Sequence, residues 1–404
     1  MFNLKKNIWK QDFPQLDGNF YYFDSAATSL KPNSVIERVN YYNRELSSNI
    51  NRGMYDKSQK ATELFEEARK SVANFINAND DEIVFTRGTT ASLNLVARAY
   101  GLENLNENDE ILTSELEHHS SVLPWINVAS KTKAKLKYIK LEKPGKITLE
   151  AVEKAITENT KVIALNYVSN VLGYITPIKE IVKLAHKYNA IVVVDGAQAI
   201  QHFTVDVKDL DIDFFAFSGH KMLGPTGIGV LYGKSSLLEL INPIEFGGDM
   251  TIDVSKNSFG WKVSPTKFEA GTMPIAEAIG LKTAIDYIEA IGLNKIKEYT
   301  KDLYDYFYNQ IKDLSDIIIY NPNSDTNIFA FNIKNVPSHD AISYFAEKNI
   351  ALRAGQHCAK LVHDYLDINS SLRGNIFIYN SYEDVDYLVK AIKEAILYFK
   401  KLGF

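Results

Sequence analysis

The run Ile191-Val192-Val193-Val194 is the feature that most constrains the fold of this chain. A strand with one solvated face alternates apolar and polar residues, whereas this run does not, so it predicts a central strand buried on both faces. From about residue 21 to residue 232, similar short apolar runs alternate with longer helix-period stretches, as in a parallel sheet with crossover helices. The other expected strands are Glu82–Thr86, Glu110–Thr113, Val162–Tyr167 and Phe214–Phe217. The sequence therefore predicts an α/β fold.

The stretches between these strands have helical periodicity, and the pattern changes after Gly233. Residues 251–267 lack a clear period, which predicts a long functional loop or a short hairpin. The expected helices are Ser58–Ile76, Ala91–Tyr100, Ile178–Asn189, Pro274–Gly292 and Ile296–Leu314, and the later strands are Ile317–Tyr320, Asn327–Ile333 and Asn375–Ile378. We expect a large domain over residues 18–289 and a small α+β domain over residues 290–404, on which residues 1–17 pack.

Composition excludes several classes of protein. The chain of 404 residues is 46% hydrophobic and 24% charged, which is typical of a globular protein and not of a disordered one. Its 45 Lys and Arg against 50 Asp and Glu give a net charge of -5, which argues against a nucleic-acid partner. The single cysteine excludes an internal disulfide framework and fits a reducing compartment. Because no apolar run reaches signal-peptide or membrane-span length, we expect a cytoplasmic protein without membrane association.

Two chemically distinctive residues follow expected strands. Asp195 ends the buried run, and Lys221 follows the strand Phe214–Phe217. Taken singly, a helix-capping Asp and a solvated Lys are the commoner interpretations. Taken together, the two lie where ligands of open α/β sheets bind. A lysine that forms a Schiff base and an acid that faces a pyridinium nitrogen are the two protein groups that pyridoxal phosphate requires.

A phosphate group also needs a binding site, and Arg87-Gly88-Thr89-Thr90 lies between an expected strand and an expected helix. Free backbone N–H groups, the positive end of the helix and two hydroxyls would converge there. A threonine that simply caps the helix is the other interpretation, and capping is compatible with phosphate binding.

Glu117-His118-His119 follows another expected strand, and no further carboxylate stands at metal-ligand spacing. We therefore expect no metal site, and we interpret the histidine as stacking on a flat cofactor.

The only cysteine, Cys358, lies in the loop-like stretch Arg353–Ala359. Most free cysteines are small buried hydrophobes. Adjacent His357 and nearby Arg353 are nevertheless cations of the kind that favour the reactive thiolate. Arg373, fifteen residues further on, can grip a carboxylate through its planar guanidinium.

At this point the residues resemble the cysteine desulfurases among the fold-type I pyridoxal phosphate enzymes, in the branch of SufS and selenocysteine lyase. The catalytic loop of that branch reads Arg-x-Gly-His-His-Cys-Ala. The resemblance rests on Tyr22–Ala27, Thr86–Thr90, Glu117–His119, Ser169–Gly173, Asp195–Ala199, Ser218–Lys221, Gly224–Gly227, Phe268–Thr272 and Tyr379–Asn380. It implies a large domain that binds the cofactor on a mainly parallel seven-stranded sheet flanked by helices. The smaller C-terminal α+β domain would carry the cysteine loop.

The resemblance also implies residue roles. Lys221 would form the Schiff base and move the α-proton of the substrate, Asp195 would face the pyridinium, and His118 would stack on the ring. Asn170 and Gln198 would bond near the phenolic oxygen of the cofactor, and Arg373 with Asn170 would bind the substrate carboxylate. The residues expected at the phosphate are Thr89, Thr90, Ser218 and His220, with Thr272 from the other subunit of a homodimer.

The implied reaction is the conversion of L-cysteine to L-alanine. The Cys358 thiolate would attack the substrate sulfur and keep it as a persulfide. An acceptor protein of the SufU or SufE type would then receive the sulfur for iron–sulfur cluster assembly.

Three departures from the family pattern stand in this sequence. Asn51 and Tyr55 replace residues that are usually histidines, Gln356 replaces the first histidine of the cysteine loop, and Lys360-Leu361 replaces the usual x-Pro. We therefore expect thiol activation to depend on His357 and the loop to be looser.

Two alternative functions remain open. The first is another enzyme of the same fold, such as a selenocysteine lyase, an aminotransferase or a racemase-like enzyme, in which Cys358 is incidental. The second is a non-catalytic subunit that binds a sulfur-transfer partner. Every group that the cofactor chemistry needs is present, which argues against the second alternative.

Overall fold

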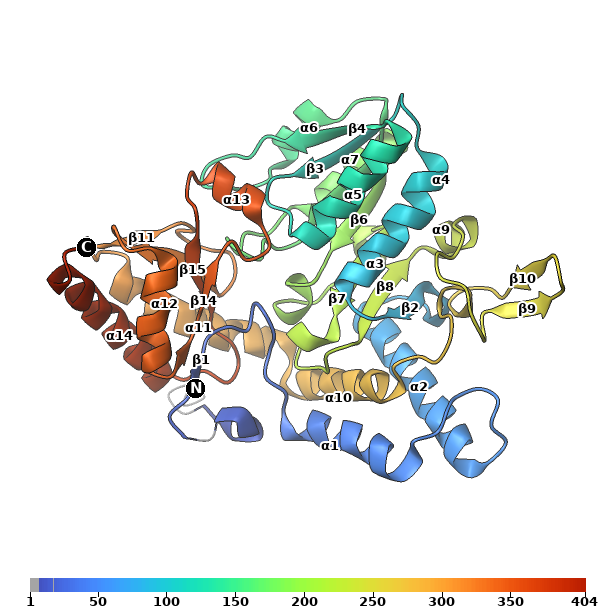
Figure 1. Cartoon of the computed structure of the whole chain (residues 1–404), viewed down its shortest axis with the longest axis horizontal. Coiled ribbons are helices and arrows are strands. Elements are labelled where there is room, and N and C mark those ends of the chain that lie inside the picture. The colour runs from blue at the N-terminus through green and yellow to red at the C-terminus, as the bar shows by residue number, and fades with distance from the viewer. Residues whose placement is uncertain (1–6, 17) are drawn as a thin grey trace.

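The computed structural model describes residues 7–16 and 18–404, and a seven-stranded sheet forms its larger part (Figure 1). Strands β4, β3, β5, β6 and β7 run parallel, whereas β8 is antiparallel to both of its neighbours. In spatial order the strands are β2 (Ile83–Thr86), β8 (Gly229–Gly233), β7 (Phe214–Ser218), β6 (Ile191–Asp195), β5 (Thr160–Asn166), β3 (Glu110–Ser114) and β4 (Lys135–Ile139). The predicted mainly parallel α/β sheet is confirmed.

The burial of β6 explains the sequence pattern with which the prediction began. Val193 packs into the core cluster on one face of the sheet, where α3 (Thr89–Val96) and α5 (His119–Thr132) lie. Val192 and Val194 pack into the cluster on the other face, where α2 (Asp56–Phe75), α7 (Ile178–Lys187) and α10 (Ile275–Ile291) lie. With apolar contacts on both sides, no position of this strand favours a polar residue until Asp195.

The remaining helices complete the cover of the large sheet. α1 (Asn33–Tyr41) packs along α10, below the sheet in Figure 1. The shorter helices are α4 (Leu102–Asn104), α6 (Leu149–Ala155), α8 (Val207–Leu210) and α9 (Ser235–Leu240). Within residues 7–16 and 18–404, no helix combines the length and apolar character needed to cross a membrane.

A smaller antiparallel sheet lies at the other end of the molecule (Figure 1). Its strands in spatial order are β11 (Ile317–Ile319), β12 (Ile328–Ile333), β15 (Ser371–Asn375) and β14 (Arg353–Gly355). The helices of this part are α11 (Leu293–Ile311), α12 (Ser338–Glu347), α13 (Lys360–Tyr365) and α14 (Tyr382–Lys401). The two sheets have largely separate apolar clusters, so each part has its own core.

One predicted strand is wrong. The sequence analysis placed a strand at Asn375–Ile378, but the strand is Ser371–Asn375 and ends where the apolar run begins. Ser371, Arg373 and Asn375 are all buried, so this strand carries polar side chains into the protein interior. Asn375 N–H then bonds to the carbonyl of Phe23 at 2.7 Å, which draws the chain out of the small sheet. The first three residues of the expected loop Arg353–Ala359 also belong to a strand, β14.

The N-terminal segment lies against the small sheet. β1 (Tyr21–Tyr22) pairs in parallel with β13 (Ile350–Ala351), and the Lys10 amine bonds to the Asp384 carboxylate at 2.7 Å. Of the expected segment 1–17, residues 1–6 and 17 lie outside the described residues. The domain division at residue 290 stays a prediction.

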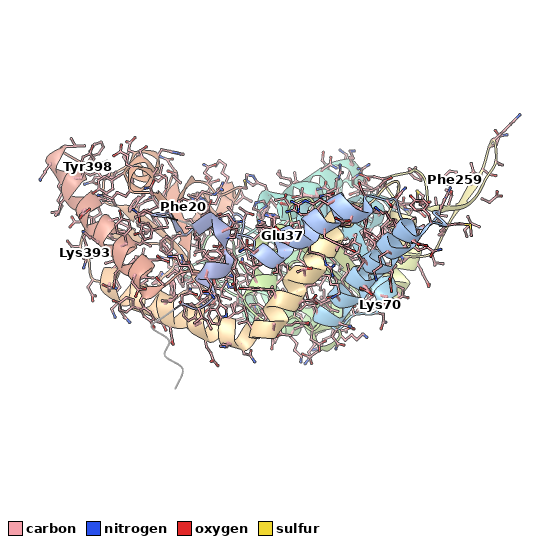
Figure 2. All side chains as sticks on the ribbon, turned by 90° about the horizontal axis from the view of Figure 1, so that it is seen from below. Phe20, Glu37, Lys70, Phe259, Lys393 and Tyr398 are labelled. Carbon is pink, nitrogen blue, oxygen red and sulfur yellow. The ribbon has the colours of Figure 1, made fainter. Side chains whose placement is uncertain are left out.

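The stretch expected to be a loop or a hairpin is a hairpin. β9 (Thr251–Val254) and β10 (Phe259–Trp261) are antiparallel, and the hairpin extends away from the body of the molecule, with Phe259 on it (Figure 2). Ile252, Val254 and Phe259 are exposed there.

Candidate active site

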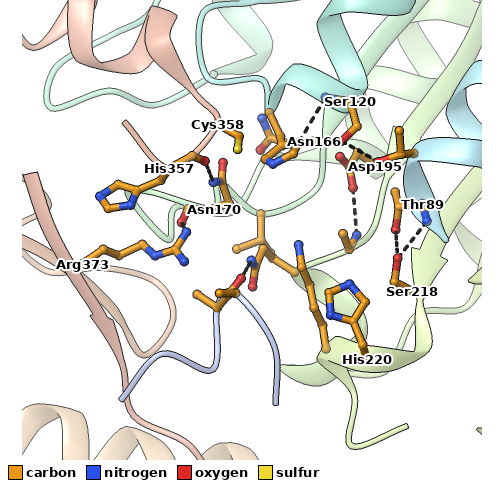
Figure 3. Close-up of a pocket in the computed structure, with 18 of the residues that line it drawn as sticks. Thr89, Ser120, Asn166, Asn170, Asp195, Ser218, His220, His357, Cys358 and Arg373 are labelled. Atoms are coloured by element: carbon orange, nitrogen blue, oxygen red, sulfur yellow. Dashed lines mark hydrogen bonds between the residues drawn. The ribbon is translucent and has the colours of Figure 1, made fainter. Parts of the chain in front are cut away.

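A cavity of about 280 Å³ lies where the large sheet faces the small one. Figure 3 shows Thr89, Asp195 and Ser218 on one side of it and His357, Cys358 and Arg373 on the other. The lining contains all the predicted site residues except Thr272, namely Thr89, Thr90, His118, Asn170, Asp195, Gln198, Ser218, His220, Lys221, Cys358 and Arg373. The fold thus gathers residues from distant parts of the sequence, from Ala26 to Arg373, around one cavity.

Asp195 and Lys221 stand at the carboxyl ends of adjacent strands, β6 and β7. The Asp195 carboxylate accepts a hydrogen bond from the backbone N–H of Ala197 at 2.9 Å. Burial raises the pKa of Asp195, and the Lys221 amine opposes that rise. Burial lowers the pKa of Lys221 to about 8, while Asp195 acts in the other direction. A substantial neutral fraction of this amine is therefore present near neutral pH, as nucleophilic attack on a carbonyl requires.

The start of α3 forms a polar site, the predicted phosphate site, near Asp195 and Lys221. Ser218 Oγ accepts from the backbone N–H of Thr89 at 2.8 Å and lies 2.7 Å from Thr89 Oγ1. Gly88 is the N-cap residue, so neither threonine caps the helix through its side chain. The backbone approaches closely here, because a Cβ built on Gly229 would lie 2.3 Å from the Gly88 Cα. Ser218 Oγ already accepts the Thr89 N–H, so an anion here would be bound by the following N–H groups of the first turn, which an α-helix leaves without intrahelical partners.

The other two residues predicted at the phosphate, Thr90 and His220, line the same cavity as Thr89 and Ser218. Thr90 Oγ1 bonds to Ser120 Oγ at 3.1 Å, and His220 Nδ1 lies 3.3 Å from Thr28 Oγ1. Burial lowers the pKa of His220 to about 4, so the ring is neutral at neutral pH. Its contribution to anion binding is then a hydrogen bond rather than a charge.

His118 is the N-cap residue of α5. Its Nδ1 accepts from the backbone N–H of Ser120 at 3.1 Å, and burial lowers the pKa of the ring to about 3. The ring is therefore neutral with its proton on Nε2. A neutral, hydrogen-bonded imidazole suits stacking on an aromatic ring better than a cation that repels a positively charged pyridinium.

Cys358 is exposed and sits in an unusual turn. His357 and Cys358 both have left-handed backbone conformations, with φ of 53° and 54°. Such a conformation costs a non-glycine residue about 1–2 kcal/mol, so neighbouring groups must hold it. The carbonyl of His357 accepts from Asn170 Nδ2 at 2.9 Å, and that of Cys358 accepts from the backbone N–H of His119 at 2.8 Å.

The expectation that His357 activates the thiol is wrong. The ring is buried, its Nε2 lies 3.1 Å from Ser371 Oγ, and burial lowers its pKa to about 2. It is therefore neutral, and it turns away from Cys358 in Figure 3. Arg353 lines the cavity as the expected cation, although its guanidinium is also paired with Asp24 at 2.8 Å.

Arg373 projects from β15 into the cavity. Its Nη1 donates to the Asn170 carbonyl at 2.9 Å, and its Nη2 lies 3.5 Å from Asp24. Burial lowers its pKa to about 10, which leaves it charged at neutral pH. Its Nε is buried without a hydrogen-bond partner among the described residues. A buried cation with an unused donor fits a ligand carboxylate.

Two predicted residues differ from the rest. Thr272 is exposed and lines a separate depression beside Arg87 and Ala91, so the fold does not bring it to this cavity. Gln198 does line the cavity, but its Nε2 donates to the Ala26 carbonyl at 2.7 Å. Only its second amide hydrogen is left for a ligand.

The sequence analysis missed several lining residues. Asn166 ends β5 in register with Asp195, and this parallel pairing of strand ends was the signal that could have found it. Asn166 Nδ2 donates to Glu117, a fully buried residue outside the lining that also accepts from Ser114 and Ser121. Burial raises the pKa of Glu117 to about 7.

Comparison with known proteins places the chain in a family. The model for class V aminotransferases matches residues 21–388. A probable cysteine desulfurase of Halalkalibacterium halodurans is 46% identical over 396 residues, which cover 96% of this chain and 98% of that one. A probable cysteine desulfurase of Staphylococcus aureus is 44% identical over 397 residues, or 96% of each chain. The chain belongs to the class V aminotransferase family, among its cysteine desulfurases.

Solved structures agree with this family assignment. A cysteine desulfurase of Escherichia coli matches with a TM-score of 0.92 and 38% identity, covering 98% of this chain and 99% of that one. One from Thermococcus onnurineus matches with a TM-score of 0.93 and 38% identity, covering 96% and 97%. The predicted fold-type I architecture is thereby confirmed.

The structure shows where the residues that depart from the family pattern lie. Asn51 and Tyr55 are exposed and do not line the cavity. Gln356 Nε2 donates to the Asn369 carbonyl at 3.3 Å, away from the thiol. Lys360 begins α13, and its backbone N–H bonds to His119 Nε2 at 3.3 Å. The segment after Cys358 is thus tied to α5 even without the usual proline.

Proposed function

We propose that this protein is a cysteine desulfurase that uses pyridoxal phosphate, converts L-cysteine to L-alanine and keeps the sulfur as a persulfide on Cys358. The single observation that carries the proposal is that Lys221 and Cys358 line one cavity. An amine that handles the α-proton and a thiol that accepts the sulfur must both reach the same small amino acid.

The residues fit the cofactor. Lys221 is the amine that would hold it, Asp195 is the buried acid for its ring nitrogen, and the start of α3 with Ser218 offers N–H and hydroxyl donors to its phosphate. When bound, pyridoxal phosphate supplies an electron sink for charge that develops at the substrate α-carbon. A carboxylate at Asp195 would stabilise a protonated ring nitrogen, and that positive charge would oppose the burial that raises the Asp195 pKa.

The chain's own residues then divide the remaining work. Arg373 binds and orients the substrate carboxylate, and Lys221, with its lowered pKa, holds or moves a proton at its Nζ. The Cys358 thiolate forms a bond to the substrate sulfur as the carbon–sulfur bond breaks. The products are alanine and the Cys358 persulfide, so cysteine and the enzyme thiol account for all atoms and no outside oxidant is needed.

We further infer that the protein works as a cytoplasmic homodimer and passes sulfur to an acceptor of the SufU or SufE type for iron–sulfur cluster assembly. Thr272 supports the dimer, because it is exposed and lies outside its own cavity, as expected of a residue that completes the site of a second copy.

The test is turnover of L-cysteine by the purified protein, scored for alanine and for protein-bound persulfide, with Cys358→Ala and Cys358→Ser as variants. We expect equal alanine and persulfide in the first turnover. Both variants should lose sulfur release while the visible absorbance of the bound cofactor remains. If Cys358→Ala keeps its activity on cysteine, the mechanism is wrong. Activity on selenocysteine alone would instead favour a lyase.

A further inference from the structure

A network of side chains behind the Cys358 turn is not used by the chemistry above. His363 lies on α13 and is fully buried, and its Nδ1 is 3.1 Å from the Ala359 carbonyl oxygen. Its Nε2 is 3.1 Å from Ser371 Oγ, and His357 Nε2 is 3.1 Å from the same oxygen. One serine hydroxyl therefore lies between two imidazoles, in a fully buried position on β15.

The direction of every hydrogen bond in this network can be deduced. A carbonyl oxygen only accepts, so His363 Nδ1 carries a proton and donates to Ala359. Burial lowers the pKa of both rings, so each is neutral and carries only one proton. His363 Nε2 is then an acceptor and takes the Ser371 proton. Ser371 Oγ must in turn accept from His357, whose proton lies on Nε2. His357 Nδ1 is left as an acceptor, which agrees with its lack of a partner in the structure.

The network and the backbone of residues 357–359 together form a closed ring. The network begins at His357 and ends at the Ala359 carbonyl, and these are the two residues that flank Cys358 in the chain. The two preceding carbonyls of the turn are held by Asn170 and by the backbone of His119. The Ala359 carbonyl is the third in succession, and His363 holds it. His357 and Ala359, the two neighbours of Cys358 in the sequence, are thereby linked by one continuous series of hydrogen bonds. Cys358 itself has a left-handed backbone conformation.

We propose that His363 is a positioning residue that, through Ser371 and His357, holds the Cys358 turn in the conformation that presents the thiol to the cavity. The proposal deepens the proposed function, because it concerns the placement of the thiol that receives the sulfur. His363 does not line the cavity, so it would act on the thiol through Ser371, His357 and the Ala359 carbonyl.

The test is amide hydrogen exchange of peptides that span residues 353–361, in protein loaded with cofactor and without cysteine. His363→Phe removes both hydrogen bonds at similar volume, and Ser371→Ala removes the middle of the chain. His363→Asn places a donor near the Nδ1 position and so restores the bond to Ala359. His186→Phe, on α7, removes imidazole contacts to Asp211 and Asp213 away from the turn and is the matched control.

We expect exchange in these peptides to be about tenfold faster in His363→Phe and Ser371→Ala, the effect of one lost buried hydrogen bond on a local opening. His363→Asn should lie within about threefold of the parent, and His186→Phe should leave exchange in these peptides unchanged. Formation of persulfide in a single turnover should fall in the same order. Because the protein has one cysteine, that signal reports on Cys358 alone.

Exchange within twofold of the parent in both His363→Phe and Ser371→Ala overturns the proposal. So does a His363→Asn variant as fast as His363→Phe, because the role would then be one of packing. If His363→Phe does not fold, Ser371→Ala and His363→Asn decide the question in the same way. Exchange is measured without turnover, so a parent protein that makes no alanine refutes the proposed function and leaves this test intact.

Discussion

The two sides of the cavity are built in different ways. Asp195 and Lys221 follow strands β6 and β7, and each of these strands is hydrogen-bonded to a neighbour on both sides. Cys358 instead comes from a turn with two left-handed residues, which single side chains and one backbone group hold in place. Strand ends inside a sheet have little freedom, whereas such a turn depends on each of its few contacts. In the proposed function, the cofactor chemistry depends on the rigid side and sulfur transfer on the adjustable one.

This difference indicates that the two halves of the reaction can be separated by mutation. Changes on the large-sheet side should alter cofactor binding and its absorbance. Changes on the small-sheet side should leave the cofactor absorbance unchanged and should affect substrate binding or sulfur transfer.

The largest effect is expected for Lys221→Ala. Turnover of cysteine should fall about 10³-fold or more, since both the covalent attachment of the cofactor and a general base are lost. The measurement is steady-state alanine production together with the visible spectrum. Lys221→Arg, which keeps the charge, should be as inactive. A spectrum unchanged from the parent would show that another amine holds the cofactor.

The second-largest effect is expected on the small-sheet side of the cavity, for Arg373→Lys. The lysine keeps the charge and loses the planar pair of donors, so KM for cysteine should rise about 10- to 100-fold, the value of one or two charge-assisted hydrogen bonds. The cofactor spectrum should not change. A fall in kcat at unchanged KM would contradict a role in carboxylate binding.

A third prediction concerns pH on the rigid side. The pKa of Lys221 is lowered to about 8, and only the neutral amine attacks a carbonyl. The rate at which cofactor-free protein captures pyridoxal phosphate should therefore rise about tenfold from pH 7 to pH 9, with a midpoint near 8. Stopped-flow absorbance measures it. Asp195→Asn removes the charge that raises the Lys221 pKa, so its midpoint should move to lower pH. A midpoint above pH 10 in the parent protein would refute the burial argument.

The smallest effect is expected for Asp24→Asn. Asp24 contacts both Arg353 and Arg373, but the Arg353 partner is partly exposed and the Arg373 distance is 3.5 Å. Turnover should change by less than about fivefold, the range of weak ion pairs. Steady-state kinetics over a range of salt concentrations would measure this. A loss of a hundredfold would show that Asp24 anchors the small-sheet side far more firmly than its contacts indicate.

The sequence predicted the rigid side better than the adjustable one. Ile191–Val194 lacks alternation because both faces are covered, and that pattern located Asp195 at a strand end. The sequence also identified the cysteine loop and Arg373 as candidate site residues. Their roles came from the family resemblance and remain predictions. What the sequence could not provide was the burial of individual polar side chains. His357 looks like a cation beside a thiol until it is seen enclosed against Ser371.

The same limit explains the misplaced strand. Ser-Leu-Arg-Gly-Asn has no apolar face, so periodicity favoured the following Ile-Phe-Ile. Arg373 is buried with a partner from a distant segment, since its Nη1 donates to the Asn170 carbonyl, whereas the Asn375 side chain is buried without a hydrogen-bond partner among the described residues. Contacts of this kind depend on the assembled fold and leave no local trace in the sequence.

Gly229 lies on β8 and contributes no side chain to the cavity, yet even one methyl group there would overlap the backbone at Gly88. The cost of such overpacking, about 1–3 kcal/mol, would fall on the loop that leads into α3. Affinity at the proposed phosphate site should therefore be controlled partly from the neighbouring strand, by a residue that is absent from the cavity lining.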